Sequence, residues 1–214
     1  MIHHRAIRRK EGMLQDVGNG YLVTDVQQYN TTGPAGGYEI FVVLPAASPP
    51  PEGYPVLYLL DGNACIAGAA DALRFQAKFH EEARIEPLMI VAVGYPGAAP
   101  FDMGRRAYDY LPAHKSRKLG DRFMQGAPWH QPGGADDFLD FLSGPLRTSL
   151  AARYPINTGR QILCGASFGG FFTLYALLTR PPVIQQICRR QPLVVVGRQP
   201  ADKGRPGDGP KPAP

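Results

Sequence analysis

Residues 161–178 read QILCGASFGGFFTLYALL, and this stretch decides the fold class. A short apolar run leads into the pentapeptide GASFG at 165–169, and a helical pattern of apolar residues follows. The pattern G-x-S-x-G between a strand and a helix is typical of a nucleophile elbow, because the glycines two positions either side of the serine allow a sharp turn. A bare G-x-S-x-G also arises by chance in many chains, so the flanking strand and helix carry the interpretation. We therefore take Ser167 as the candidate catalytic nucleophile.

A nucleophilic serine also needs hydrogen-bond donors that stabilise the negative charge developing on the substrate oxygen. In an elbow one donor is the backbone N–H of the next residue, here Phe168, at the start of a helix whose dipole adds partial positive charge. A second donor comes from the loop after an earlier buried strand, and DGNA (61–64) directly follows the apolar run VLYLL (56–60). Gly62 and Asn63 are the candidate donors from that loop.

The rest of the chain alternates strand-like and helix-like segments. Strand character is expected at 20–29, 38–44, 56–60, 88–95 and 161–167, and helical periodicity at 68–82, 135–154 and 169–180. The helical pattern at 135–154 is interrupted near Gly144-Pro145. Residues 96–134 form a long irregular segment of the kind that often carries substrate contacts. This order predicts an α/β fold with a mostly parallel sheet, helices on both faces and an antiparallel edge formed by the first two strands.

Length and composition fit one large soluble domain of 214 residues, with 44% hydrophobic and 19% charged residues. No apolar run approaches the roughly 20 residues that span a bilayer, so no membrane partner is expected. The basic N-terminus lacks the apolar segment of a secretory signal, and the three cysteines show no metal-binding spacing. We expect a cytoplasmic protein. The chain has no P-loop, no G-x-G-x-x-G after a strand and no cluster of metal ligands, so we expect no metal and no other cofactor.

The net charge of +5 is concentrated in the last part of the chain. Residues 181–214 contain six Lys or Arg and two Asp, which amounts to +4, and the body of the protein is nearly neutral. Because the basic residues belong to the tail and not to the body of the protein, no nucleic-acid partner is expected, and binding through the tail is the only such alternative considered.

Three longer blocks extend the pattern beyond the elbow: YPVLYLLDGNA (54–64), VAVGYP with PFDMGRRAYDYLP (91–112), and GGADDFLDFL with LRTSLAARYPINTGRQILCGASFGGFFTLYALLTRP (133–181). Together they resemble the siderophore esterase (enterochelin esterase-like) branch of the α/β-hydrolases, in order, over about residues 20 to 181. The resemblance implies an α/β-hydrolase fold and a small-molecule ester as substrate, either a ferric tri-catechol siderophore or a smaller acyl ester. One departure is Ala166, where the branch usually has histidine, at a position that is not the catalytic base.

The same resemblance places RRAYDYLP near the substrate entrance. Arg105 or Arg106 would then be available to an anionic substrate. The alternative is that these arginines pair with Asp102 or Asp109 in a structural network.

The general base is the missing part of this pattern. In α/β-hydrolases the acid and the histidine follow the serine, but the 47 residues after Ser167 contain two aspartates, Asp202 and Asp208, and no histidine. All five histidines precede Ser167. Because a triad is defined by geometry rather than by chain order, His114 and His130 in the irregular segment remain candidate bases.

The composition changes after about residue 180, where a Pro/Gly-rich segment begins. We interpret 1–180 as a partial α/β-hydrolase domain whose C-terminal part is missing, and 181–214 as a disordered or out-of-frame tail. The tail can be back-translated so that an adjacent frame encodes a tryptophan-rich block of the kind that the resemblance leads us to expect next, which suggests a frameshift. The leading prediction is a serine esterase impaired by the missing histidine. Acyl transfer on the same scaffold and a non-catalytic binding protein remain the alternatives.

Overall fold

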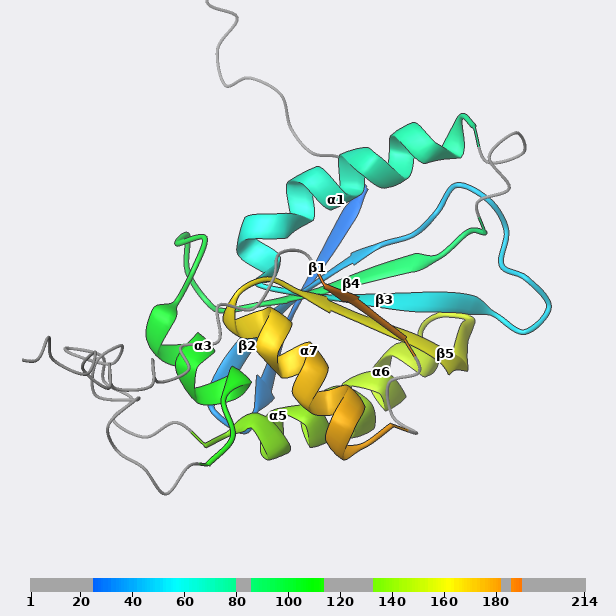
Figure 1. Ribbon diagram of the computed structural model, residues 1–214. Coiled ribbons are helices and arrows are strands. Elements are labelled where there is room, and N and C mark those ends of the chain that lie inside the picture. The colour runs from blue at the N-terminus through cyan, green and yellow to red at the C-terminus, as the bar shows by residue number, and fades with distance from the viewer. Residues whose placement is uncertain (1–24, 80–85, 114–132, 182–185, 190–214) are drawn as a thin grey trace, which may run out of the picture.

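The computed structural model describes residues 25–79, 86–113, 133–181 and 186–189. Within these residues the strands form one six-stranded sheet in the order β1-β2-β4-β3-β5-β6 (Figure 1). The strands are β1 (Val26–Gly33), β2 (Gly36–Val43), β3 (Tyr54–Leu60), β4 (Met89–Gly94), β5 (Ile156–Gly165) and β6 (Gln186–Arg189). β1 and β2 are antiparallel to their neighbours, whereas β4, β3, β5 and β6 are mutually parallel. The predicted mostly parallel sheet with an antiparallel edge is confirmed.

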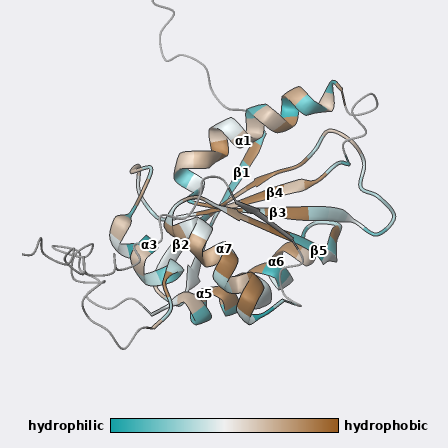
Figure 2. Ribbon diagram, in the orientation of Figure 1, coloured by the Kyte–Doolittle hydropathy of each residue, from teal (hydrophilic) through white to brown (hydrophobic). Residues whose placement is uncertain are grey.

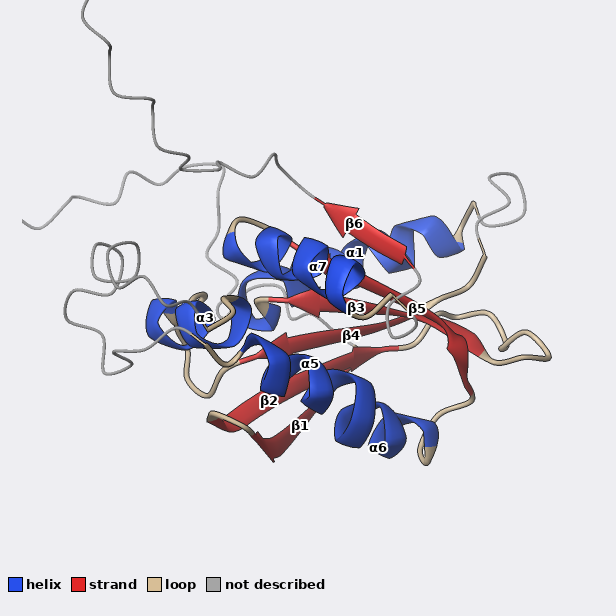
Figure 3. Cartoon of the chain, turned by 60° about the horizontal axis from the view of Figure 1, so that its bottom comes forward, coloured by secondary structure: helices blue, strands red, loops and turns tan. Residues whose placement is uncertain are grey.

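Helices cover both faces of this sheet, as Figures 1 and 3 show. On one face lies α1 (Gly62–Ala77), which connects β3 to β4. The other face carries α3 (Met103–Tyr110), α5 (Ala135–Phe141), α6 (Arg147–Ala151) and α7 (Phe168–Thr179). No helix among the described residues is long and apolar enough to cross a membrane.

The core follows the two-residue period of the strands. Tyr38, Ile40 and Val42 of β2 point to the face where Phe138 and Phe172 close the larger cluster of buried side chains. The alternate positions, such as Val43 and Ile90, pack against Ala70 and Leu73 of α1. Figure 2 shows β3, β4 and α7 as largely hydrophobic, which agrees with strands buried on both faces.

Two helices begin where the sequence pattern did not place them. α1 starts at Gly62 rather than at residue 68, because Asp61 adopts a left-handed backbone (φ 59°, ψ 49°) that turns the chain directly from β3 into the helix. The irregular segment contains α3, whose N-cap Asp102 accepts a hydrogen bond from the Arg105 backbone N–H at 3.0 Å. This short helix was not predicted because glycines and prolines surround it, although Asp102 is a typical capping residue.

The other boundaries shift by a few residues. β1 begins six residues later than expected, and β5 begins at Ile156, five residues before the predicted apolar run. The helical segment that starts at 135 continues through Gly144-Pro145 as a π-helix, η1 (Leu142–Leu146), instead of breaking. Pro145 lacks a backbone N–H, so a local change in hydrogen bonding accommodates it.

The segment after Arg180 contains structure that the sequence did not predict. Residues Gln186–Arg189 form β6, which pairs in parallel with β5 from Ile162 to Gly165. These four residues lie in the segment that we interpreted as a disordered or out-of-frame tail, and the free edge of β5 offers backbone donors and acceptors to such an extended segment. The apolar run LVVVG at 193–197 lies outside the described residues.

Candidate active site

The two loops selected from the sequence meet at one edge of the sheet. β3 and β5 are adjacent and parallel, with Leu59 opposite Cys164, so the loops that follow them emerge side by side. The strand order also reverses at β3, since β4 lies on one side of it and β5 on the other. Open α/β sheets bind ligands at such a switch point, outside the carboxyl ends of the strands.

Ser167 stands at this edge in a strained conformation. Its backbone angles are φ 56° and ψ −119°, a region that non-glycine residues rarely adopt and that costs about 1–3 kcal/mol. The residue is exposed and directly precedes α7. A Cβ on Gly165 would lie 2.6 Å from the carbonyl carbon and oxygen of Gly169, so the turn requires a residue without a side chain there. The local geometry is that of a nucleophile elbow.

The loop after β3 brings a second helix N-terminus to the same edge. The first N–H groups of a helix have no acceptor within it, and α1 begins with Gly62 and Asn63. A Cβ on Gly62 would lie 3.0 Å from the Gly94 nitrogen and the Val93 carbonyl carbon, so the start of α1 packs closely against the end of β4. α7 starts with Phe168 beside it. The candidate oxyanion donors Gly62, Asn63 and Phe168 thus all begin helices at one sheet edge.

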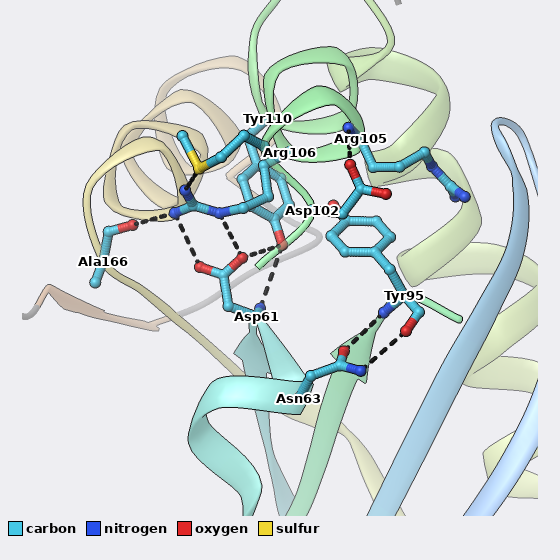
Figure 4. Close-up of polar contacts among 9 residues, drawn as sticks. Asp61, Asn63, Tyr95, Asp102, Arg105, Arg106, Tyr110 and Ala166 are labelled. Carbon is cyan, nitrogen blue, oxygen red and sulfur yellow. Dashed lines mark hydrogen bonds and ion pairs between the residues drawn. The ribbon is translucent and has the colours of Figure 1, made fainter. Parts of the chain in front are cut away.

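The Asn63 side chain has a structural task. Its Nδ2 donates to the Tyr95 carbonyl oxygen at 2.9 Å, and its Oδ1 accepts from the Tyr95 backbone N–H at 2.8 Å (Figure 4). Its Nδ2 also donates to the Gly97 carbonyl oxygen at 3.1 Å. These bonds tie the loop after β4 to the start of α1. Only the backbone N–H of Asn63 is therefore considered as an oxyanion donor.

Arg106 lies in a buried network with Asp61 and Tyr110 (Figure 4). Its Nε is 2.6 Å from Asp61 Oδ1, and its Nη2 is 3.1 Å from Asp61 Oδ2. The Tyr110 hydroxyl lies 3.3 Å from Asp61 Oδ1. Burial raises the pKa of the Asp61 carboxyl, and the Arg106 guanidinium and the Tyr110 hydroxyl oppose that shift.

Arg105 is buried as well and points the other way. Both of its terminal nitrogens donate to the Gly37 carbonyl oxygen, at 3.2 and 3.1 Å. Its guanidinium carbon lies 4.7 Å from the ring centre of Tyr38 and 4.9 Å from that of Tyr95. The geometry of both arginines favours a structural network over contact with an anionic substrate, although Arg106 pairs with Asp61 rather than with Asp102 or Asp109.

Asp109 is the second buried carboxylate near this edge. It accepts a hydrogen bond from the Tyr38 hydroxyl at 2.9 Å and has no exposed surface. Burial raises its pKa to about 6, and the Tyr38 hydrogen bond and the charge of Arg105 oppose that rise. Its position on α3, behind Arg105 and Tyr38, makes it part of the scaffold.

The candidate bases His114 and His130 lie outside the described residues, as do the other three histidines and Asp202 and Asp208. Within the described residues no group of three or more His, Cys, Asp or Glu side chains could hold a metal ion.

Sequence reasoning missed Asp61 and Tyr110. The sequence did contain a signal for a buried ion pair. Asp61 is an acid at the end of a buried strand, directly before Gly62, and Arg105 and Arg106 follow in a later block.

The family comparison agrees with this architecture. A model of the esterase family, described as "Putative esterase", matches residues 33–194. The chain therefore belongs to this esterase family, and its sheet and helices have the α/β-hydrolase fold. The matched region extends beyond Arg180 and includes β6.

Individual relatives match this chain over only part of their own length. Ferri-bacillibactin esterase BesA of Bacillus subtilis is 35% identical over 171 residues, which cover 80% of this chain and 58% of the relative. Apo-salmochelin esterase of Escherichia coli is 32% identical over 166 residues, 78% of this chain and 50% of the relative. The crystal structure of the BES protein from Bacillus cereus matches with a TM-score of 0.69 at 30% identity, covering 81% of this chain and 63% of that chain. The chain spans between half and two thirds of the length of these relatives.

Proposed function

We propose that this chain is a serine hydrolase of carboxylic esters with Ser167 as its nucleophile. The observation that carries the proposal is the strained backbone of an exposed serine between β5 and α7, beside the N-terminus of α1. A strained residue of this kind persists only where the surrounding structure holds it, and such residues cluster at active sites. Membership of an esterase family supports the same reaction class.

The proposed reaction has two stages, acylation of Ser167 and hydrolysis of the acyl group. Ser167 Oγ attacks the ester carbonyl carbon, and the carbonyl oxygen becomes an oxyanion that accepts hydrogen bonds from the N–H of Phe168 and of Gly62 or Asn63. Collapse of this intermediate expels the alcohol and leaves an acyl group on Ser167, which water then removes. The serine proton has to pass to a base and from there to the departing alcohol oxygen.

The general base is the group that this chain does not supply at the usual place after the serine. No histidine follows Ser167, and His114 and His130 are the candidates for the role. In a well-studied serine protease the loss of the serine or the histidine lowers turnover on the order of 10⁶-fold. We therefore propose that this polypeptide turns over esters very slowly, unless one of these two histidines reaches Ser167.

The substrate class is proposed from the relatives. Two of them carry names that describe esterases of ferri-bacillibactin and apo-salmochelin, so a siderophore ester or a smaller acyl ester is the proposed substrate. Because Arg105 and Arg106 are occupied by internal contacts, recognition of an anionic substrate is not assigned to them.

The test is covalent labelling, which needs only one turnover. An alkyl fluorophosphonate should add one adduct to the wild-type chain, measured by intact mass, and peptide mapping should place it on Ser167. Ser167→Ala should remain unlabelled, while Ser149→Ala, which removes another exposed serine on α6, should label like the wild type. Because no histidine follows Ser167, labelling should be slow; labelling that persists in Ser167→Ala, or a wild-type chain left unlabelled after prolonged incubation with excess probe, would refute the proposal.

Turnover of p-nitrophenyl acetate then tests the base. The expected result is a rate barely above the uncatalysed one, and any remaining Ser167-dependent rate should vanish in His114→Ala or in His130→Ala. A clear burst that is lost only in Ser167→Ala would contradict the proposed impairment.

A further inference from the structure

We propose that Arg106 is a positioning residue that holds the two oxyanion-stabilising loops in register through Asp61 and Tyr110. The inference rests on the proposed function and adds to it the group on which the geometry of the oxyanion site depends. Arg106 comes from α3, which belongs to neither of the two loops.

On the first side Arg106 fixes the loop after β3. Its Nε and Nη2 bind the two carboxylate oxygens of Asp61 at 2.6 and 3.1 Å, and both side chains are almost fully buried. A guanidinium that binds a carboxylate through two parallel hydrogen bonds fixes the plane of that carboxylate as well as its position. Asp61 is the residue immediately before Gly62, so its orientation is linked to that of the Gly62 peptide N–H.

On the second side the same guanidinium contacts the elbow. Its Nη2 lies 3.5 Å from the carbonyl oxygen of Ala166, the residue before Ser167. Its central carbon lies 5.8 Å from the ring centre of Phe168, the residue after Ser167. One planar group therefore lies against the neighbours of the nucleophile on both sides in the chain and binds the acid that precedes the second donor loop. Figure 4 shows its contacts with Ala166 and Asp61.

Tyr110 connects this arrangement to the core. Its hydroxyl lies 3.3 Å from both Asp61 Oδ1 and the Asp61 backbone nitrogen, and its side chain has no exposed surface. The ring packs against Phe138 and Phe172, with centres 5.7 and 5.8 Å away. The left-handed backbone of Asp61 is thus held by a side chain that is itself fixed in the core.

A purely stabilising role would be a poor explanation for this ion pair. Removing two charges from water costs several kcal/mol per ion, and replacing a buried pair by neutral groups of similar volume is often neutral for stability. Arg106 and Asp61 also lie beside the N-termini of α1 and α7, whose backbone N–H groups must both reach the substrate oxyanion in the proposed reaction. Misplacement of a catalytic group by about 1 Å can cost on the order of 10²-fold in rate, so reactivity should be more sensitive than stability.

The experiment separates these roles with a double variant. Arg106→Met removes the fork and leaves Asp61 as an uncompensated buried charge, whereas Asp61→Asn/Arg106→Met is neutral and keeps a residue type that tolerates a left-handed backbone. We expect the double variant to recover the melting temperature lost by Arg106→Met. We expect both to react with the fluorophosphonate on the order of 10²-fold more slowly than the wild type.

Two further variants complete the set. Arg106→Lys keeps the charge but not the planar fork, so its labelling rate should lie between those of the wild type and Arg106→Met. Arg160→Met removes an exposed arginine paired with Glu86 and should label like the wild type. Amide hydrogen exchange of peptides 61–66 and 165–171 should accelerate together in Arg106→Met and in the double variant, without change in the β1–β2 peptides.

Each outcome decides the matter. Wild-type labelling by the double variant, or acceleration of exchange in only one of the two peptides, overturns the positioning role. If the wild-type chain is not labelled, the proposed function fails, and the exchange data alone decide whether Arg106 couples the two loops. Should Arg106→Met fail to fold, Arg106→Lys and the double variant carry the same comparison.

Discussion

Gly165→Ala should damage both the stability and the reactivity of the chain through contact with backbone atoms alone. The added Cβ would lie 2.6 Å from the carbonyl carbon and oxygen of Gly169 and 2.9 Å from its Cα. These atoms belong to the first turn of α7, so relief requires the helix to move away from β5. Overpacking of this kind costs about 1–3 kcal/mol, and for a chain of this size the melting temperature falls by roughly 2–4 °C per kcal/mol. We expect a decrease of roughly 2–12 °C, together with slower fluorophosphonate labelling of Ser167 because the elbow moves with the helix.

Gly68→Ala is the matched control for this measurement. Gly68 lies within α1, and a Cβ there would meet no atom within 4 Å. Alanine in a helix interior is favoured over glycine by about 1 kcal/mol, so the control should melt at the same temperature as the wild type or higher. Thermal unfolding followed by circular dichroism compares the two variants. Equal melting temperatures for Gly165→Ala and Gly68→Ala would refute the argument that close packing shapes the elbow.

Three further predictions concern strain, a buried acid and a loop anchor. Ser167→Gly should be about 1–3 kcal/mol more stable than Ser167→Ala in urea unfolding, because only glycine relieves the strained φ, and equal stabilities would count against strain. The folded-state pKa of Asp109, about 6, lies above its usual value of 3.8, so the folded state retains this proton to higher pH. Stability should therefore fall by at most about 3 kcal/mol as the pH rises from about 4 to about 6, and Asp109→Asn, measured over the same range, should lose this slope. Asn63→Ala should lower the free energy of unfolding by about 1–3 kcal/mol, because the Tyr95 N–H loses its acceptor on Asn63. The same change should speed amide exchange at Tyr95, and unchanged exchange would contradict the anchoring role.

The sheet and the elbow could be predicted because their signals are local in the sequence. An apolar run such as MIVAVG is buried at every position in the structure, and Gly165 of GASFG marks a turn that only a residue without a side chain allows. The strand β6 could not be predicted in this way. Its pairing depends on the free edge of β5 rather than on a strong pattern of its own, and neighbouring prolines pointed to an unstructured segment.

The same difference between local patterns and tertiary contacts applies to the candidate site. Ser167, Phe168, Gly62 and Asn63 follow from motifs next to buried strands, and the structure brings their backbones to one edge. The partners of Arg106 could not be read from spacing, because 45 residues separate it from Asp61 and the contact depends on the tertiary packing of α3. Local patterns therefore identified the backbone parts of the site but not the ion pair between them.

The positions of the residues with a positive φ are consistent with the proposed catalytic role of this edge. Three non-glycine residues among those described have a positive φ: Asp25, Asp61 and Ser167. Asp25 directly precedes the first residue of β1, at the start of the described residues. Asp61 and Ser167 instead end adjacent parallel strands, each directly precedes a helix, and Arg106 contacts Asp61 and the residues on either side of Ser167. Glycine would relieve the strained backbone of Ser167, so a serine at this position is consistent with the proposed role of its hydroxyl, while the Asp61 carboxylate beside it binds Arg106.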